Sequence, residues 1–570
     1  MIILLCGINA KFIHTNLAIR QLKGYAEKNS SHNINIVEFT INNYTDEMLK
    51  TIYEKKPDVL GFSCYIWNIE IVKKLCLLIK KVLPDTTIIL GGPEVSYNPT
   101  EILKTFSCDF VISGEGEKAF LSLIDALQTK SSYDNIAGIS FKNDTQIISN
   151  PSKQGIDMAK LPFPYTDFTQ VENKICYYEA SRGCPFGCKY CLSSIERGVR
   201  FAPIEKVKKE LKLFLDNSVE QVKFVDRTFN ADKKFAKQII QFLIENDNGK
   251  TNFHFEVEAG LLDDELINLL SSARKGLFQL EIGIQSTNKS TLKAINRNND
   301  MKQIEYCITK LQRNKNIHLH LDLIAGLPLE DFESFKKSFN DVYRLDPHQL
   351  QLGFLKILKG SAMEKLCTEY DINYSPFPPY EVLSTHCLSY NDILILKGVE
   401  EMVEIYYNSN RFYLSTTYIS KKFDNPFDFY LKLSEFKKQK DMASITHNKN
   451  DAFVFLIEFC ESFFDKDEVN NIKTKLKFDF LSHERPRSNP IWAQQNMLDK
   501  NALYDLVVKQ KAVLKYMPEY SDIDPKQLLK LIHIEKFPID PLSPDNKHAT
   551  YIFDYSTRNF CGNATAILLE

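Results

Sequence analysis

The sequence lacks any long apolar run, since no stretch approaches the roughly 20 apolar residues that cross a bilayer. The first residues, Met1 to Leu5, are apolar but have no charged start and no cleavage site, so we expect a buried strand and not a secretion signal. Net charge is also nearly absent, at −2 for 570 residues, which gives no whole-chain attraction for nucleic acid or membranes. We therefore expect a cytoplasmic protein that binds neither.

The chain is too long for a single hydrophobic core, and its 570 residues predict about three domains. Its composition, 44% hydrophobic and 25% charged, is typical of globular domains and not of disordered segments. Without a secretion signal, the 13 cysteines indicate a reducing compartment, in which disulfides are not expected.

Three of these cysteines stand in the segment SRGCPFGCKYC, residues 181–191, with three and then two residues between them. Gly183, Pro185 and Gly187 disfavour a helix and favour a tight loop, which can turn three sulfurs toward one point. Three thiolates are one short of the four that close an ordinary [4Fe–4S] cluster, so one iron would stay open to a small molecule. Isolated buried thiols and structural zinc are the alternatives. Zinc would need a fourth ligand, and the next cysteine, Cys307, stands alone.

Residues 1–145 alternate short apolar runs with amphipathic stretches, which predicts a doubly wound, flavodoxin-like or Rossmann-like parallel sheet. Ligands of such sheets bind beyond the carboxyl ends of the strands, and the residues at these ends are small or polar. The expected strands are 2–6, 33–39, 59–64, 87–91, 110–113 and 137–141.

A proline-containing linker is expected at 146–172, and the strand–helix alternation resumes over residues 173–369. Six strand–helix units predict a partial (β/α)6 TIM barrel, whose chemistry would gather at the carboxyl ends of its strands. The expected strands are 175–181, 221–225, 252–257, 278–284, 319–325 and 349–355. Residues 370–570 are expected to form a mainly helical C-terminal region without a metal-binding spacing.

The spacing Cys184-x3-Cys188-x2-Cys191, with Tyr190 just before the last cysteine, resembles the signature of the radical S-adenosylmethionine (radical SAM) superfamily. The resemblance implies that these three cysteines hold a [4Fe–4S] cluster whose open iron binds S-adenosylmethionine. One electron, from an external donor such as flavodoxin or ferredoxin, would then cleave the sulfonium to a 5′-deoxyadenosyl radical.

Polar residues along the barrel strands match the positions that contact S-adenosylmethionine in this superfamily. Carboxylates can hold the ribose hydroxyls or the ammonium group, Arg297 can bind the methionine carboxylate, and Tyr190 can lie beside the adenine. Glu258 is an alternative to Glu256 because it points to the same face of its strand. A structural salt bridge is the alternative role for each polar position. The expected residues are Tyr178, Tyr190, Asp226, Asn230, Glu256, Gln285, Arg297 and Asp322.

The segments 58–68, 89–96 and 109–117 resemble the cobalamin (vitamin B12) binding domain that precedes many radical SAM cores. The Asp-x-His-x-x-Gly motif of histidine-ligated cobalamin is absent, since Phe12 and Leu17 occupy two of its positions, so His14 is not expected to ligate cobalt. Ordinary loop glycines of a flavodoxin-like sheet are the alternative. The expected cobalamin-binding residues are Asn9, His14, Ser63, Cys64, Tyr65, Gly91, Gly92, Pro93, Glu94, Gly114, Glu115 and Gly116.

The resemblance extends to bacterial B12-type radical SAM proteins with a poorly characterised C-terminal region. It implies methyl transfer from cobalamin to an unactivated carbon of a small-molecule or natural-product-like substrate. The alternatives are cobalamin-dependent rearrangement or cyclisation without methyl transfer, a non-catalytic cobalamin sensor, and a methylthiotransferase. The last would need a second cluster on three N-terminal cysteines. Cys6 and Cys64 lie at expected strand ends, but no cysteine follows the fourth strand, and Cys108 stands before the fifth.

Overall fold

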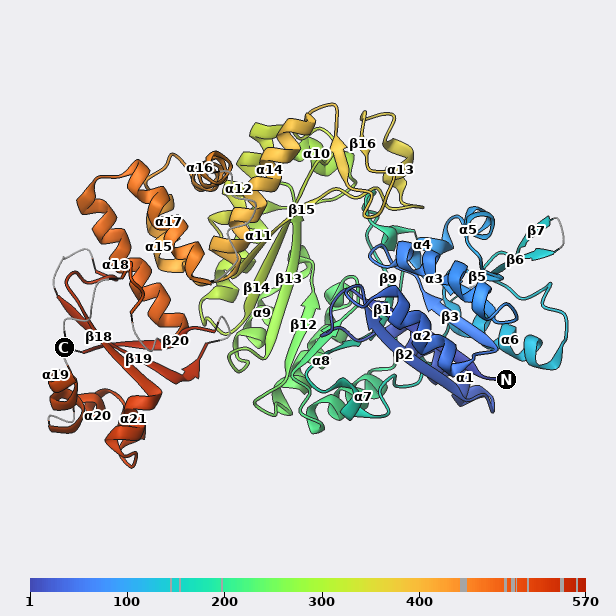
Figure 1. Ribbon diagram of the computed structural model, residues 1–570, viewed down its shortest axis with the longest axis horizontal. Helices are drawn as coiled ribbons and strands as arrows, with labels where there is room; N and C mark the ends of the chain where they lie inside the picture. Colours follow the sequence, from blue (N-terminus) through green and yellow to red (C-terminus); the bar gives the residue numbers. More distant parts are fainter. Residues whose placement is uncertain are drawn as a thin grey trace.

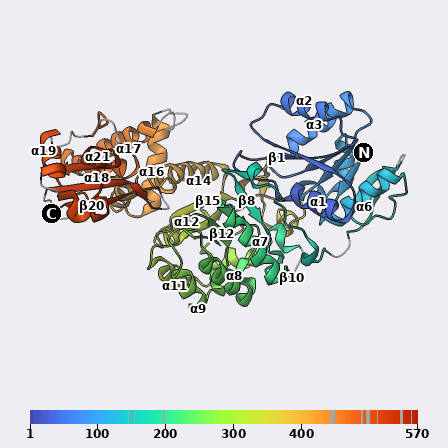
Figure 2. The same cartoon turned by 90° about the horizontal axis from the view of Figure 1, so that it is seen from below.

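The computed structural model describes residues 1–143, 146–152, 155–195, 198–440, 449–485, 489–493, 498, 500–509, 512–543, 548–559 and 562–569. Three bodies follow one another along the long axis, with the two termini at opposite ends (Figures 1 and 2). The N-terminal domain lies at one end, the barrel in the centre and the C-terminal region at the other end. The barrel is therefore the part that can contact both others.

The N-terminal domain is built on a seven-stranded sheet in the order β2-β1-β3-β4-β5-β6-β7. The first five strands in this order are parallel, as predicted, and helices cover both of their faces, so β1 and β3 are buried throughout. One edge of the sheet adds antiparallel strands to this parallel core, since β6 pairs antiparallel with β5 and with β7. The strands are β1 (Ile3–Asn9), β2 (Ile34–Thr40), β3 (Val59–Ser63), β4 (Thr87–Gly91), β5 (Phe110–Ile112), β6 (Ile139–Asn143) and β7 (Gln146–Ser149), and the helices are α1 (Leu17–Asn29), α2 (Thr45–Lys55), α3 (Ile69–Val82), α4 (Pro93–Ser96), α5 (Pro99–Thr105) and α6 (Gly116–Thr129).

The central body is a six-stranded parallel sheet in the order β15-β14-β13-β12-β11-β8, which confirms the predicted partial barrel. Its strands are β8 (Ile175–Tyr178), β11 (Gln221–Phe224), β12 (Asn252–Glu256), β13 (Phe278–Gln285), β14 (His318–Ala325) and β15 (Gln349–Phe354). Its helices are α7 (Ile204–Asp216), α8 (Lys233–Glu245), α9 (Asp264–Ser271), α10 (Lys289–Ala294), α11 (Met301–Gln312) and α12 (Phe332–Tyr343).

Most barrel helices begin at a side-chain cap directly after a strand-end loop. The cap oxygens accept hydrogen bonds from backbone N–H groups of the first turn, which otherwise have no partner. The caps of α8 to α12 are Asp232, Asp263, Asn288, Asp300 and Asp331. These caps fix where each strand-end loop stops, and so they fix the rim that carries the polar residues.

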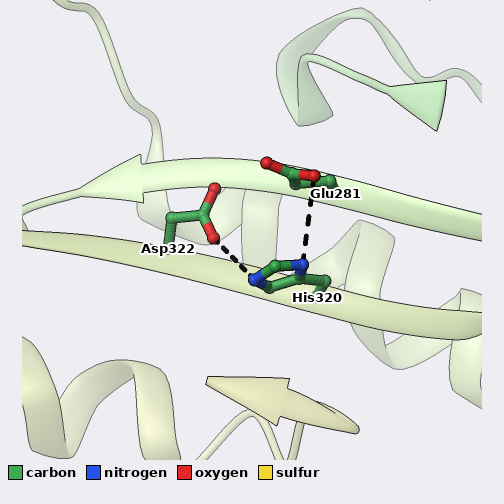
Figure 3. A group of neighbouring side chains, drawn as sticks. All are labelled: Glu281, His320 and Asp322. Atoms are coloured by element: carbon green, nitrogen blue, oxygen red, sulfur yellow. Dashed lines mark ion pairs between the residues drawn. The ribbon is translucent and has the colours of Figure 1, made fainter. Parts of the chain in front are cut away.

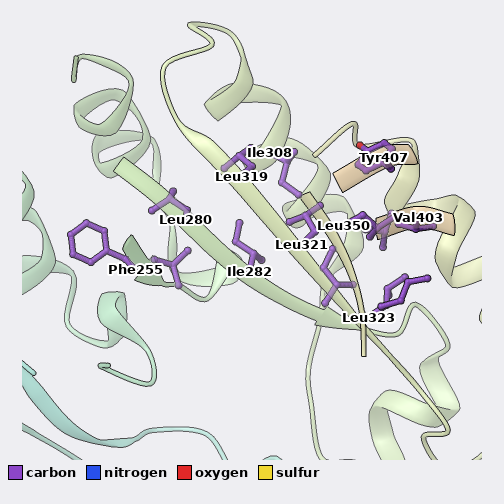
Figure 4. Close-up of a cluster of buried hydrophobic side chains, with 14 of the residues drawn as sticks. Phe255, Leu280, Ile282, Ile308, Leu319, Leu321, Leu323, Leu350, Val403 and Tyr407 are labelled. Carbon is purple, nitrogen blue, oxygen red and sulfur yellow. The ribbon is translucent and has the colours of Figure 1, made fainter. Parts of the chain in front are cut away.

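The barrel strands alternate apolar residues on their outer face with polar residues on their inner face. Figure 4 shows the outer face, where Leu280, Ile282 and Leu321 pack in one continuous core with Val403 and Tyr407 of the C-terminal region. The Tyr407 hydroxyl donates to the Pro347 carbonyl oxygen at 2.5 Å, which ties this region to the barrel. Since the apolar residues face outward, the barrel interior is left polar and differs from the aliphatic filling usual in TIM barrels.

The cysteine segment begins as a strand, where the sequence had predicted only a loop. β9 (Ser181–Cys184) pairs antiparallel with β10 (Gly198–Phe201). Gly183 has a φ of 99°, and a Cβ atom added there would lie 2.0 Å from the Gly198 carbonyl oxygen. The glycine therefore permits a close strand pairing that delivers Cys184 to the end of the hairpin.

The C-terminal region is mostly helical, as predicted, but it also contains a three-stranded antiparallel sheet that the sequence analysis missed. The part of the chain that the structure describes contains no helix with the length and apolarity needed to traverse a membrane. The elements are α13 (Ala362–Leu366), β16 (Asn373–Tyr374), β17 (Val382–Ser384), α14 (Tyr390–Val403), η6 (Glu404–Asn408), α15 (Tyr413–Ser420), α16 (Pro426–Gln439), α17 (Lys449–Phe463), α18 (Lys466–His483), α19 (Lys500–Tyr504), η7 (Asp505–Lys509), α20 (Ala512–Tyr516), α21 (Pro525–Leu531), β18 (Ile532–Phe537), β19 (Ala549–Arg558) and β20 (Ala564–Leu569).

Candidate active site

A cavity of about 220 Å³ lies at the carboxyl ends of the barrel strands. It brings together all three cysteines of the CxxxCxxC segment and five of the eight residues predicted to contact S-adenosylmethionine. The lining residues are Cys184, Phe186, Cys188, Tyr190, Cys191, Ser193, Ser194, Arg227, Thr228, Glu256, Val257, Glu258, Glu281, Gly283, Gln285, Arg297 and Asp322.

The loop that carries the cysteines is held by backbone hydrogen bonds. The Lys189 N–H donates to the Ile295 carbonyl oxygen at 2.9 Å, and the Lys189 carbonyl oxygen accepts from the Met363 N–H at 2.8 Å. Cys184 and Cys188 are 9% and 6% exposed, so their sulfurs face the cavity and not solvent. Burial raises the pKa of Cys188, and the neighbouring Arg297 guanidinium, 3.7 Å from its sulfur, opposes this rise. Three thiols at one cavity fit an iron–sulfur cluster with three protein ligands.

Two buried polar atoms of the cavity, Gln285 Oε1 and Arg297 Nε, have neither a hydrogen-bond nor an ion-pair partner in the described protein. Asp322 Oδ1 also forms no well-aligned hydrogen bond, but it lies 3.0 Å from His320 Nε2. Arg297 Nη2 already pairs with Glu258 Oε2 at 2.9 Å and donates to the Gly283 carbonyl oxygen. Gln285 lies in the left-handed region with a φ of 70°, at a bulge in β13. Strained backbone and unpaired buried polar atoms are typical of a ligand site, so the cavity fits a polar ligand such as S-adenosylmethionine.

The structure does not bring Tyr178, Asp226 and Asn230 to the cavity lining, although we had predicted them as contacts of S-adenosylmethionine. Tyr178 is 2% exposed, and its hydroxyl donates to Glu210 Oε2 on α7 at 2.7 Å. Strand β8 presents alternate residues to opposite faces, and this tyrosine faces the helix layer.

The other two residues support neighbours of the cavity. The Asp226 carboxylate accepts from the Ala180 N–H at 2.9 Å and from the Ser181 hydroxyl at 2.5 Å. Burial raises the pKa of Asp226 to about 7, and these hydrogen bonds oppose the rise. Asn230 exchanges two 2.9 Å hydrogen bonds with the backbone of Glu258. Both residues therefore position the cavity wall without lining it.

A charged layer inside the barrel forms the floor of the cavity. Figure 3 shows His320 between Asp322 and Glu281, with nitrogen–oxygen distances of 3.0 Å and 4.0 Å. Glu281 also lies 2.9 Å from His254 and 3.1 Å from the Lys223 ammonium group. The ligand atoms of Glu281, His320 and Asp322 are close enough for a metal ion. However, the Lys223 ammonium group and His320, whose pKa is raised by Asp322 against the effect of burial, already place positive charge beside both carboxylates, so this arrangement is a charge network and gives no argument for a cation.

The network moves the pKa values of its carboxylates in opposite directions. Burial alone would raise the pKa of Glu281, but His254, Lys223 and His320 lower it to about 2. Burial raises the pKa of Glu256 to about 7, and the charge of Glu281 adds to this rise. One carboxylate is therefore held ionised at neutral pH, while its neighbour titrates near neutrality.

Replacing Glu281 by glutamine is expected to destabilise the protein in a pH-dependent way. A folded pKa of about 2 against an ordinary value of 4.5 stabilises the fold above pH 4.5, and this stabilisation is lost as pH falls toward 2. We expect E281Q to lose about 2 to 3 kcal/mol of unfolding free energy at pH 6 and much less at pH 3. Urea unfolding of the metal-free protein, followed by circular dichroism, measures this difference. Glu54, which is exposed, provides the control E54Q. An E281Q effect on the unfolding free energy that is equal at both pH values would contradict the lowered pKa of Glu281.

The sequence analysis did not name several lining residues, including Arg227, Thr228 and Glu281. The sequence pattern that marks inward-facing strand residues was present. β13 reads FQLEIGIQ and β14 reads HLHLDLIA, with polar residues at alternate positions. In a barrel, such alternation places every second residue inside. Glu258, considered only as an alternative, lines the cavity together with Glu256.

The carboxyl edge of the N-terminal sheet faces the barrel mouth. Tyr65, after β3, stacks on Trp67 with ring centroids 4.5 Å apart, and the Trp67 indole donates to the Ile8 carbonyl oxygen at 2.9 Å. Burial raises the pKa of Tyr65 to about 12, while the positive charge of the cavity residue Arg227 opposes the rise. Since Trp67 is 42% exposed, this edge offers a flat aromatic surface next to the cavity.

Glu115, predicted to bind cobalamin, instead takes part in ion pairs between domains. The Arg182 guanidinium contacts Glu117 at 2.6 Å, Glu179 at 2.8 Å and Glu115 at 3.3 Å, and Arg200 also pairs with Glu115. Arg182 stands two residues before Cys184, so this cluster links the loop after β5 directly to the cysteine hairpin. The sequence pattern did not predict these ion pairs, because the arginines and Glu115 belong to different domains.

Other residues predicted to bind cobalamin are also engaged by protein groups. His14 hydrogen-bonds to the Tyr177 hydroxyl at 2.8 Å and forms a bridge to Ile175, which places it against β8. The Asn9 side chain donates to the His14 carbonyl oxygen at 2.9 Å. Ser63 accepts a hydrogen bond from Asn16 at 2.9 Å. These contacts shape the strand-end loops and join them to the barrel.

The glycines of these loops serve the packing of one loop on another. A Cβ atom added at Gly92, where φ is 116°, would lie 2.5 Å from the Cys64 carbonyl oxygen, and one at Gly114 would lie 2.9 Å from Ser152 Oγ. Gly116 begins α6 beside Leu22. At Gly92 and Gly114 the packing of the loops on the protein is thus sufficient to exclude a side chain.

Replacing Gly92 by alanine is expected to destabilise the N-terminal domain by at least about 1 kcal/mol, because both its φ and its contact with Cys64 exclude a side chain. Gly91 is the matched control, since an added Cβ would have its nearest contacts at 3.8 Å and 3.9 Å. The chain has two tryptophans, so in a Trp492→Phe background the fluorescence of Trp67 reports this domain alone. Equal denaturation midpoints for G91A and G92A would contradict this prediction.

The cysteines considered for a second cluster lie in the apolar core of the N-terminal domain. Cys6 and Cys64 are fully buried, and Cys108 is nearly so. Burial raises the pKa of all three thiols far above the ordinary value, which favours the protonated form over the thiolate that ligates iron.

Comparison with family models divides the chain into three matches. Residues 3–124 match the family described as "B12 binding domain", and residues 178–342 match "Radical SAM superfamily". Residues 368–553 match a family described as "Protein of unknown function (DUF4080)". The first two matches cover the parallel strands of the N-terminal sheet and most of the barrel, including the CxxxCxxC segment.

Among curated relatives, 2-(S-pantetheinyl)-carbapenam-3-carboxylate methyltransferase of Streptantibioticus cattleyicolor is 27% identical over 324 residues, covering 51% of this chain and 46% of that protein. An anaerobic magnesium-protoporphyrin IX monomethyl ester cyclase of Synechocystis sp. is 24% identical over 406 residues, covering 66% and 78%. The chain thus spans about half the length of the first curated relatives it matches.

The solved structure of the cobalamin-dependent S-adenosylmethionine radical enzyme OxsB, with aqua-cobalamin and S-adenosylmethionine bound, has the same fold. Its TM-score is 0.58 at 16% identity, and the alignment covers 83% of this chain and 79% of that one. Both domain matches stand in the order that the sequence predicted, so the chain combines a B12-binding domain with a radical SAM domain.

Proposed function

We propose that this protein is a cobalamin-dependent radical SAM enzyme that transfers a methyl group to an unactivated carbon. The observation that carries the proposal is the cavity itself, where three cysteine thiols meet carboxylates, Gln285 and Arg297 beneath the edge of a B12-binding domain. Each of these groups alone could serve a structural role. Together, at one rim of the barrel, they supply both the cluster ligands and the polar contacts that S-adenosylmethionine needs.

Cys184, Cys188 and Cys191 would hold the [4Fe–4S] cluster. When bound, the cluster and S-adenosylmethionine supply a 5′-deoxyadenosyl radical that abstracts hydrogen from carbon. The loop residues around these cysteines hold the thiols at the cavity wall, and the buried surroundings keep water away from the reacting groups. An external low-potential donor such as flavodoxin or ferredoxin would supply the electron.

The cavity walls would bind and orient S-adenosylmethionine. Arg297 and Gln285 offer the unpaired buried atoms, an N–H donor and a carbonyl acceptor. The carboxylates of Glu256 and Asp322 can accept hydrogen bonds from ribose hydroxyls or the ammonium group. Tyr190, next to the last cysteine, can lie along the adenine. Tyr178, Asp226 and Asn230 would act through these residues by fixing the strands that carry them.

The carboxyl edge of the N-terminal sheet would bind cobalamin, which when bound supplies a transferable methyl group. The Tyr65–Trp67 stack and the loop at Gly91, Gly92 and Pro93 offer aromatic and backbone surface toward a large flat ligand. Since this edge lies beside Arg227, cobalamin and S-adenosylmethionine would share one reaction space. The substrate would be a small molecule that enters between the two domains.

A second candidate, radical cyclisation or rearrangement without methyl transfer, is favoured by one observation. The similarity to the cyclase covers a larger share of the chain than the similarity to the carbapenam methyltransferase. The two reactions differ in one product, because methyl transfer consumes a second S-adenosylmethionine and releases S-adenosylhomocysteine.

The test is anaerobic reconstitution with iron and sulfide, followed by addition of cobalamin, desalting, and assay with dithionite and S-adenosylmethionine. We expect about four irons per chain, retained corrin absorbance, 5′-deoxyadenosine and S-adenosylhomocysteine. About eight irons would indicate a methylthiotransferase. Deoxyadenosine without retained corrin would overturn the cobalamin assignment, and retained corrin without deoxyadenosine under any substrate tested would favour a sensor. Deoxyadenosine without S-adenosylhomocysteine would favour the cyclase candidate.

A further inference from the structure

One segment outside the two cofactor-binding domains touches both of them. We call residues 356–384 the strap; it follows β15 and ends with β17. Backbone bonds hold its two ends together and to the barrel, since the Ile357 N–H donates to the Tyr380 carbonyl oxygen at 3.0 Å and the Val382 N–H donates to Leu355 at 2.8 Å. Val382 is fully buried, and its side chain would lie 2.6 Å from a Cβ added at Gly326. The strap is therefore packed firmly on the barrel rim.

Both ends of the strap contact the N-terminal domain. The Tyr380 hydroxyl donates to Glu94 Oε2 at 2.8 Å, and these residues are 4% and 5% exposed. Glu94 belongs to α4, directly after the Gly91-Gly92-Pro93 loop. Gly360 packs so closely on Tyr97, at the end of α4, that an added Cβ would lie 2.4 Å from its ring. Figure 1 shows α13 and β16 of the strap on the side of the barrel where the N-terminal domain lies.

The middle of the strap contacts the cysteine loop. The Met363 N–H at the start of α13 donates to the carbonyl oxygen of Lys189 at 2.8 Å, and Lys189 lies between Cys188 and Cys191. Met363 is fully buried, so this bond is shielded from water. The same short segment thus joins the cysteine loop and the loop after β4, which come from different domains.

We propose that the strap, through the hydrogen bond from Tyr380 to Glu94, fixes the loop after β4 relative to the cysteine loop and thereby sets the separation of cobalamin and cluster. This inference rests on the proposed function. Tyr380 is a positioning residue, because it acts on Glu94 and does not line the cavity. A hydrogen bond between a hydroxyl and a carboxyl group, both buried, is strong enough to matter, since removing the donor leaves the carboxyl group buried without that partner. Most of the strap lies in the region matched by the family of unknown function. Holding the two cofactor-binding domains in place would be one role of that region.

The experiment compares the reconstituted wild type with Y380F, which removes only the hydroxyl. We expect Y380F to keep its iron content but to release bound cobalamin about tenfold faster, as followed by corrin absorbance after dilution into excess cobalamin-binding protein. Pulsed electron paramagnetic resonance between cob(II)alamin and the reduced cluster is expected to show a broader distance distribution. Tyr390, which is exposed on α14, provides the matched control Y390F, with wild-type behaviour in both measurements.

The outcomes separate this inference from the proposed function. If wild type and Y380F hold cobalamin equally and give the same distance distribution, the role of the strap is overturned and the proposed function stands. If the wild type itself retains no cobalamin, the proposed function fails and this inference with it. If Y380F also loses iron, this inference is overturned, because the hydroxyl then supports the cysteine loop itself and not its separation from the loop after β4.

Discussion

Replacing Cys188 by alanine is expected to reduce the iron content from about four atoms per chain to nearly none and to abolish 5′-deoxyadenosine formation. Cys188 is buried in the cavity wall, and its sulfur lies 3.7 Å from Arg297. A cluster with only two protein thiolates would lose its anchorage, so the effect should exceed a hundredfold on the rate of S-adenosylmethionine cleavage. Cys184 and Cys191 line the same cavity and should behave alike.

The measurement is iron analysis and product assay on anaerobically reconstituted protein. Cys367, which is half-buried and outside the cavity, provides the control C367A, which should keep iron and activity. Cobalamin retention by C188A should stay close to wild type, because the N-terminal sheet carries that proposed site. A C188A variant that retains about four irons per chain would contradict the assignment of the cysteines.

Replacing Arg182 by alanine is expected to destabilise the junction of the N-terminal domain and the cysteine hairpin by about 3 kcal/mol. Among the residues that the structure describes, the change leaves Glu117 and Glu179 without an ion-pair partner, and Arg200 still pairs with Glu115. These side chains are only slightly exposed, so water compensates little for the lost charge. Burial already raises the pKa of Glu179, an effect that Arg182 opposes.

Urea unfolding with Trp67 fluorescence in the Trp492→Phe background measures the effect, since the indole lies in the N-terminal domain. Arg344, an exposed arginine paired with Asp341 at 2.9 Å, provides the control R344A, with an expected change below about 1 kcal/mol. Adding Glu117→Gln to R182A should recover part of the loss, because it removes one unpaired charge. An unchanged midpoint for R182A, with no recovery in the double variant, would show that the ion-pair cluster contributes nothing to this junction.

Much of the architecture follows from local patterns. The strands of the barrel were predicted to within a few residues because buried β-strands and amphipathic helices differ in hydrophobic period, and capping residues such as Asp232 and Asp263 mark the helix starts. The three-stranded sheet at residues 532–569 was missed, because its strands stand among longer helical patterns. The strand at 137–141 was predicted, but its antiparallel direction as β6 was not, because strand direction depends on pairing and not on the period. The strand β7 lies in the segment expected as a linker.

The sequence by itself determined the cysteine loop, the order of the polar residues along the barrel strands and the division into a sheet domain and a barrel, since spacing and periodicity act within short segments. Only the tertiary structure decided which polar groups remain free for a ligand. Tyr178 turned to the helix layer, Glu115 was taken by arginines of the barrel, and Glu94 was taken by Tyr380, 286 residues away in the chain. A side chain's partner depends on which segments pack together, and no local pattern records that packing.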